Sequence, residues 1–187
     1  MLDRKIKDVY DFFSHNIRTF NAEIVTTIEC LKVGFIDLKS DEFDIIYEAA
    51  YLLDLYDAGF NLALDFLSDN FLKGSSEDID LENVTEEFLS HIPGYLETCG
   101  LKVEKIFKKS LLNINSFVFK NIYKIILYEI IKVTSGNLQI KIDENIAFYS
   151  SAIKEDYPKI FEIFAKILKN FDLSLTIGGN SVVMVKK

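Results

Sequence analysis

An unbroken helical pattern of apolar residues near the N-terminus constrains this chain more than any other feature. Between positions 6 and 31 these residues recur every three or four positions, and no proline interrupts them. The pattern predicts one amphipathic helix from about Asp3 to Leu38, roughly 50 Å long at 1.5 Å per residue. Such a rod cannot bury its apolar stripe alone and needs a helical partner. The stripe consists of Ile6, Val9, Phe13, Ile17, Phe20, Ile24, Ile28 and Leu31.

A second helix follows after a short loop and supplies that partner. Ser40, Asp41 and Glu42 read as an N-cap followed by first-turn acids, and the helix is expected to end near Asn70. The two helices would form an antiparallel hairpin with apolar surface on more than one side. We therefore expect two copies to pair as a four-helix bundle, which makes the protein a homodimer. The expected inward-facing residues are Phe43, Ile46, Leu52, Leu53, Tyr56, Phe60, Ala63 and Leu67.

The second helix is strongly acidic. It has eight acids and no lysine or arginine between positions 41 and 70. One interpretation is a solvated face, and the other is a partner-facing surface that attracts a basic patch. The acids are Asp41, Glu42, Asp44, Glu48, Asp54, Asp57, Asp65 and Asp69.

Beyond the linker Lys73-Gly74-Ser75-Ser76 the pattern changes to mixed helix and strand. We expect an α+β fold in which residues 1–72 form a helical hairpin domain and residues 77–187 form a small α/β sandwich. The expected helices are Glu86–Glu97, Phe117–Thr134 and Tyr157–Asn170. The expected strands are Leu101–Phe107, Leu138–Ile142, Asn145–Ser150, Leu173–Ile177 and Ser181–Val185, with turns at 135–137 and 178–180.

Composition excludes several classes of function. The net charge of −8 leaves no basic stripe for a nucleic-acid backbone. Cys30 and Cys99 are isolated, so we expect neither a disulfide nor a metal site. The sequence has no signal peptide and no apolar run of roughly 20 residues, so we expect a cytoplasmic protein without a membrane segment.

His15 is the principal candidate for chemistry, because it lies on the first helix among polar neighbours. It is two positions from both Phe13 and Ile17, about 200° around the helix, and is therefore expected to point outward. Asp11, Arg18 and Thr19 lie within one turn of it. A neutral imidazole nitrogen can attack phosphorus while nearby donors hold the phosphoryl oxygens.

The segment around His15 resembles the H-box of sensor histidine kinases, whose usual form is Ser-His-Glu/Asp-Leu-Arg-Thr-Pro. Ser14, His15, Arg18 and Thr19 match that form. Asn16 replaces the acid that follows the histidine, and Phe20 replaces the proline.

Later segments resemble the ATP-binding domain of the same kinases. Residues 79–84 resemble the entry to its first helix, residues 101–104 the following strand, and residues 121–142 the N-box region. Glu129 stands where the kinases have a magnesium-binding asparagine, and Lys132, Thr134 and Gly136 match. The glycine-rich nucleotide segments are absent between Lys141 and Lys187, so we expect no ATP binding.

This layout resembles two families of dimeric histidine phosphotransferases, from the sporulation phosphorelay and from the alphaproteobacterial cell cycle. The resemblance implies that His15 accepts a phosphoryl group from a response-regulator receiver aspartate and passes it to another receiver. Asn16, Arg18, Thr19 and Asp11 would position the phosphoryl group or contact the receiver. No resident cofactor is expected, because Mg²⁺ would come with the receiver.

Three other interpretations stay open at this stage. The protein could be a non-catalytic dimeric adaptor for a receiver or kinase, or a kinase with an unusual nucleotide site. A phosphatase role, with Thr19 or Asn16 orienting water, is compatible with phosphotransfer. His91, the other histidine, is interpreted as structural or incidental.

Overall fold

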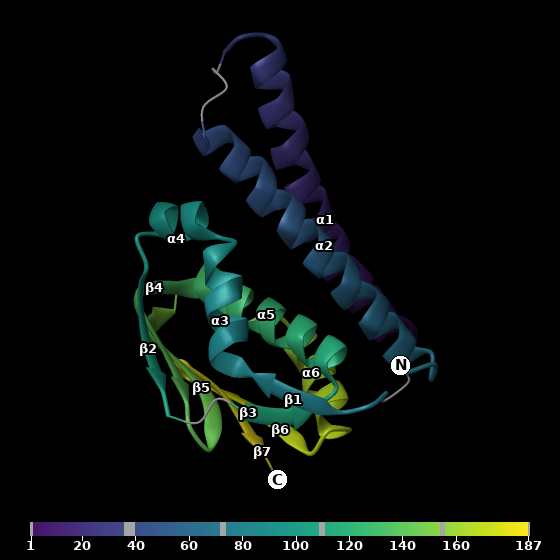
Figure 1. Ribbon diagram of the computed structural model, residues 1–187. Coiled ribbons are helices and arrows are strands. Elements are labelled where there is room, and N and C mark those ends of the chain that lie inside the picture. Colours follow the sequence, from purple (N-terminus) through teal and green to yellow (C-terminus); the bar gives the residue numbers. More distant parts are fainter. Residues whose placement is uncertain (1, 36–39, 72–73, 109–110, 154–155, 187) are drawn as a thin grey trace.

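The computed structural model describes residues 2–35, 40–71, 74–108, 111–153 and 156–186. It begins with two long helices packed side by side, α1 (Leu2–Lys32) and α2 (Ser40–Leu67) (Figure 1). Aromatic rings hold them together, with the ring centroid of Tyr56 on α2 lying 5.9 Å from Phe13 and 5.2 Å from Phe20 of α1. Tyr56 and Phe13 are fully buried.

Helix α1 ends earlier than the apolar pattern predicts. Gly34 adopts φ +72°, and the N–H groups of Gly34 and Phe35 donate to the carbonyls of Leu31 and Cys30. This is a Schellman motif, which stops a helix with a left-handed residue. The prediction that this helix continues to Leu38 is therefore wrong, because the helix is capped at Gly34. Residues 36–39 lie outside the described part. The expected N-cap side chains at 40–42 also lie outside it.

The C-terminal part is built on a five-stranded mixed sheet. The strand order is β2-β4-β5-β7-β6, with β2 and β4 parallel and the other pairs antiparallel. The strands are β2 (Lys102–Phe107), β4 (Thr134–Ile142), β5 (Asn145–Ile153), β6 (Leu173–Gly178) and β7 (Ser181–Lys186). The α+β class predicted from the sequence is therefore confirmed.

Gly136 does not form the turn expected at 135–137. Strand β4 continues through this position, and the register with β5 shifts between Ser135 and Leu138. Gly136 has φ +84°, and the N–H of Asn137 donates to the hydroxyl of Ser151 over 2.8 Å. The glycine thus allows a β-bulge inside a longer strand.

Four shorter helices and a two-stranded sheet complete the fold. The helix expected at Glu86–Glu97 is two helices, because Pro93 starts a new one at the position where a missing N–H is tolerated. Two four-residue strands that pair with each other were not predicted. These elements are α3 (Leu81–Ser90), α4 (Pro93–Cys99), α5 (Ser116–Val133), α6 (Ile160–Lys169), β1 (Glu77–Asp80) and β3 (Leu111–Ile114).

Helix α5 is the centre of the molecule. It lies between the five-stranded sheet and the α1–α2 hairpin (Figure 1), and 13 of its 18 residues are buried. Gly59 lets α2 approach it closely, because a Cβ there would overlap the side chain of Ile125. The hairpin and the sheet thus share one continuous core. The division at 72–77 into two domains and the four-helix bundle of two copies stay predictions.

Candidate functional site

His15 lies on the exposed side of α1. It is about 160° around the helix from Phe13, which is fully buried against α2. Within the described part of the chain, the imidazole has no hydrogen bond or ion pair. Both ring nitrogens are therefore accessible to a partner that approaches α1 from solvent.

Three of the candidate residues surround His15 on the same surface. Asp11, Arg18 and Thr19 are all exposed and lie three or four positions from it, which places them on adjoining turns. The Thr19 hydroxyl donates to the carbonyl of His15 over 3.0 Å, so its proton is engaged and its oxygen can act only as an acceptor for a further partner. Arg18 is then the cationic donor beside the imidazole.

Asn16 lies elsewhere, although it follows His15 directly in sequence. It is 7% exposed, and its amide nitrogen donates to the carbonyl of Phe12 over 2.9 Å. Its amide oxygen accepts from Nζ of Lys132 on α5 over 3.1 Å. The structure therefore places Asn16 in the contact between α1 and α5, away from the exposed surface where a receiver or a phosphoryl group would lie.

Asn16 belongs to a buried polar network with Tyr56, Glu129 and Lys132. Glu129, 2% exposed, accepts a hydrogen bond from the Tyr56 hydroxyl and another over 2.8 Å from Lys132. Burial raises the pKa of Tyr56 well above its usual value, and the negative charge of Glu129 raises it further. Tyr56 is therefore a neutral donor to the carboxylate. We call these four residues the Glu129 network.

The Glu129 network occupies the face of α5 that the sequence resemblance assigns to nucleotide and magnesium. Glu129, which takes the place of the magnesium-binding asparagine, contacts Tyr56 of α2, and Lys132 on the next turn contacts Asn16 of α1. Glu129 is almost fully buried by these contacts. The residues on this face therefore do not fit an adenine nucleotide with its metal ion.

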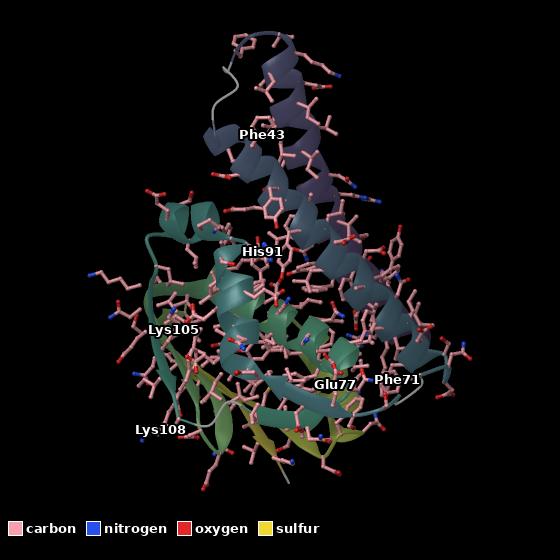
Figure 2. All side chains as sticks on the ribbon, viewed as in Figure 1. Phe43, Phe71, Glu77, His91, Lys105 and Lys108 are labelled. Carbon is pink, nitrogen blue, oxygen red and sulfur yellow. The ribbon has the colours of Figure 1, made fainter. Side chains whose placement is uncertain are left out.

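His91 has a structural place at the junction between the hairpin and α3. The Tyr47 hydroxyl lies 2.9 Å from its Nδ1, and the Tyr51 ring stacks on it with centroids 4.2 Å apart. Figure 2 shows His91 where α3 approaches the hairpin. Lys124 adds to this junction, because Nζ lies 5.6 Å from the Tyr51 ring centroid and 2.9 Å from the Glu87 carboxylate.

A second contact fixes α4 against the hairpin. Glu48 of α2 accepts from the backbone N–H of Gly94 over 2.6 Å and from that of Tyr95 over 3.2 Å. A carboxylate at a helix N-terminus satisfies N–H groups that lack an intrahelical partner. The sequence carries no local signal for this contact, because the two partners lie 46 positions apart.

Two other expectations concern metals and membranes. No group of three His, Cys, Asp or Glu side chains in the described ranges is placed to hold a metal ion. Cys30 and Cys99 are free thiols. No helix in the described part of the structure has the length and apolar character needed to cross a membrane.

No protein-family model matches the chain, and no curated protein matches it in sequence. Solved structures do resemble it. The Acinetobacter baumannii histidine kinase AdeS superposes with a TM-score of 0.57 at 12% identity, covering 91% of this chain and 94% of that one. The cytoplasmic segment of histidine kinase QseC superposes with a TM-score of 0.55 at 12% identity, covering 70% and 92%.

The chain has a histidine-kinase-like fold. The coverage of the first neighbour, 91% of this chain, spans the hairpin as well as the sheet and its helices. The expected histidine-kinase-like core is therefore confirmed. At 12% identity the likeness shows the fold alone.

Proposed function

We propose that this protein is a phosphorelay histidine phosphotransferase. His15 would accept a phosphoryl group from the aspartyl phosphate of one response-regulator receiver and pass it to the aspartate of another. The observation that carries the proposal is the accessible, unpartnered imidazole on the helical hairpin of a histidine-kinase-like fold. In this proposal the protein acts in two-component signalling, between one receiver and another.

The chemistry requires little from this chain beyond a positioned nucleophile. A neutral imidazole nitrogen forms the N–P bond while the acyl P–O bond breaks, and the receiver aspartate leaves as a carboxylate with the bonding electrons. Arg18 would hold equatorial phosphoryl oxygens beside His15. The receiver would bring Mg²⁺, which neutralises charge in the transition state. The reverse sequence delivers the group to a second receiver aspartate.

The buried Glu129 network supports receivers rather than ATP as the phosphoryl source. The resemblance gives Glu129 the place of the asparagine that would hold magnesium and phosphates, whereas here Glu129 contacts Tyr56 of the hairpin, and Lys132 beside it contacts Asn16. Purified protein should therefore acquire label from a phosphorylated receiver and none from labelled ATP with magnesium. Incubation with a panel of labelled receiver domains, and separately with ATP, measures this. Label from ATP alone would contradict the proposal and indicate a kinase.

The proposal includes a homodimer formed through the hairpin. Large apolar side chains are exposed toward the end of the hairpin away from the sheet, including Val25 at 52%, Phe43 at 57% and Phe35 at 84%. Exposed apolar surface of this kind marks an interaction site. A second hairpin would cover it in a four-helix bundle, which leaves His15 on the outer side of α1.

The proposed dimer can be tested by placing charges in its expected interface. Replacing both Val25 and Ile28 with glutamate places two buried charges in the expected bundle, so the protein should elute as a monomer. The exposed residue Thr26 on the His15 side of α1 provides the control, because Thr26→Glu adds a charge there and should leave the dimer intact. Size-exclusion chromatography with light scattering measures the mass. A wild-type protein that is monomeric at micromolar concentration would contradict the bundle.

The acidic surface of α2 favours one alternative, a non-catalytic adaptor that binds a receiver or kinase. Asp44, Asp57 and Asp65 are exposed on α2, and α2 has no basic residue in its last turn. An adaptor would bind its receiver equally well after His15 is replaced and would never carry label. Receiver binding without labelling of the wild-type protein would therefore favour this function.

A further inference from the structure

Helix α4 lies beside the hairpin (Figure 1). A groove of about 690 Å³ is lined by residues of α1, α2, α4 and α5 at this place. Its walls come from four helices, and all of its charged residues are acids. Among the described residues, none of these carboxylates is ion-paired with a lysine or arginine. The acids are Glu23 of α1, Asp44 and Glu48 of α2, and Glu97 of α4.

Glu48 is held by two backbone N–H groups of α4, whereas the Glu23 carboxylate has no hydrogen bond or ion pair among the described residues. Burial raises the pKa of Glu23, and the negative charge of Glu48 raises it further. Burial also raises the pKa of Glu48; the N–H groups of Gly94 and Tyr95 lower it, and Asp44 raises it. A cation in the groove would relieve the repulsion between Glu23 and Glu48 and would replace lost hydration.

Tyr128 is an independent observation at the same place. It lines the groove, is 4% exposed, and its hydroxyl has no hydrogen-bond partner within the described residues. The ring of Tyr95 lies 5.1 Å from that of Tyr128, so the groove offers aromatic surface beside its acids. Lys132 already lies over the Tyr128 ring, with Nζ 5.5 Å from the centroid, so the Tyr128 hydroxyl and the Tyr95 ring are what this pair offers a ligand. Together with the carboxylates they suit a guanidinium group.

The groove lies close to His15. His15, Thr19 and Glu23 follow one another at intervals of four residues, which places them on one ridge of α1. Glu23 is about 12 Å along the helix from His15 at 1.5 Å per residue. A protein partner covers about 800 Å² of surface. A receiver seated on His15 therefore extends over the mouth of the groove, and the neighbouring acids of α2 would attract a basic partner.

We infer that this groove binds an arginine side chain of the receiver that docks over His15. The identity of the partner rests on the proposed function. The affinity of the groove for a guanidinium group is independent of that function. The guanidinium N–H groups of the arginine would donate to the carboxylates of Glu23 and Glu97 and to the hydroxyl oxygen of Tyr128. The site would select basic receivers and fix their orientation relative to the imidazole.

The affinity is tested with a peptide probe. We expect acetyl-Arg-Arg-Arg-amide, in 0.15 M salt, to shift the NMR amide signals of Glu23, Gly94 and Tyr95, whereas the neutral citrulline analogue leaves them unchanged. Glu23→Gln should weaken binding about fivefold. Glu29→Gln removes the same charge from an exposed position of α1 outside the groove and should change binding less than twofold.

Tyr128→Phe separates the groove from general attraction to an acidic protein, because it changes no charge. We expect a threefold loss of peptide affinity from this variant. Equal shifts with the citrulline peptide, or unchanged affinity in both Glu23→Gln and Tyr128→Phe, would overturn the inference.

Transfer kinetics test the partner. With a receiver that labels the protein, Glu23→Gln should raise KM for the receiver at least fivefold and leave kcat within twofold. Unchanged KM would overturn the assignment to the receiver. His15→Gln should bind the arginine peptide as tightly as the wild type, because His15 lies outside the groove. The two proposals can therefore fail separately. A wild-type protein that never carries label refutes the proposed function, and the peptide titration still tests whether the groove binds arginine.

Discussion

Replacing His15 with glutamine is expected to abolish labelling by phosphorylated receivers. Glutamine keeps the length and polarity of an exposed position but has no nucleophilic nitrogen, so the N–P bond cannot form. Loss of a catalytic nucleophile typically lowers turnover by more than about 1,000-fold. Because the imidazole makes no hydrogen bond within the described part of the chain, its loss should leave the melting temperature unchanged. Transfer of ³²P followed by gel autoradiography measures the effect.

The second histidine of the chain supplies the matched control. His91→Gln removes an imidazole that is hydrogen-bonded to Tyr47 and stacked on Tyr51, so it should lower stability modestly and leave labelling intact. Acid-labile, base-stable label on the wild type, retained in His91→Gln and lost in His15→Gln, identifies the acceptor. Persistent labelling of His15→Gln would contradict the proposed function.

Much of the architecture was predictable, because it depends on local periodicity. The apolar stripe of α1, the strand at 102–107 and the long apolar helix α5 are visible as spacing within a single window of sequence. Element ends were less predictable. The early end of α1 depends on the left-handed conformation of Gly34, and the continuity of β4 depends on Gly136 in a bulge. A glycine alone does not distinguish a turn from either of these.

The candidate site was also predictable only where it depends on local periodicity. The exposure of His15, Arg18 and Thr19 agrees with their positions on the helical wheel of α1. The burial of Asn16 was not predicted, because its partner Lys132 lies 116 positions away. Long-range polar contacts leave no periodic signal in a single sequence. The contact of Glu129 with Tyr56 was missed for the same reason, because the two residues lie 73 positions apart.

The Glu129 network should be among the most sensitive polar clusters in the protein. Lys132→Met keeps the length of the side chain but leaves the carboxylate of Glu129, 2% exposed, without its cation. Breaking a buried ion pair on one side costs about 3–5 kcal/mol. Lys132 itself retains 29% side-chain exposure, so we expect a loss of about 2–3 kcal/mol in the free energy of unfolding. Urea denaturation followed by circular dichroism measures it.

Replacing Glu129 instead of Lys132 is expected to lower the free energy of unfolding less. Glu129→Gln still accepts a hydrogen bond from Tyr56, and Lys132 can turn its ammonium group toward water, so the cost should be about 1 kcal/mol. In the double variant no charge is buried without a partner. Its cost should therefore be smaller than the sum of the two single costs by at least about 1 kcal/mol.

The energetic coupling between Lys132 and Glu129 shows which interactions hold the hairpin against α5. If it is present, the contact from Asn16 and Tyr56 to α5 is a specific polar clamp that sets the orientation of the His15 helix on the sheet domain. A Lys132→Met cost below about 0.5 kcal/mol, or additive single costs, would mean that apolar packing alone holds the hairpin against α5. Lys105→Met breaks an exposed ion pair with Glu86 and is the control, since such pairs contribute less than about 1 kcal/mol.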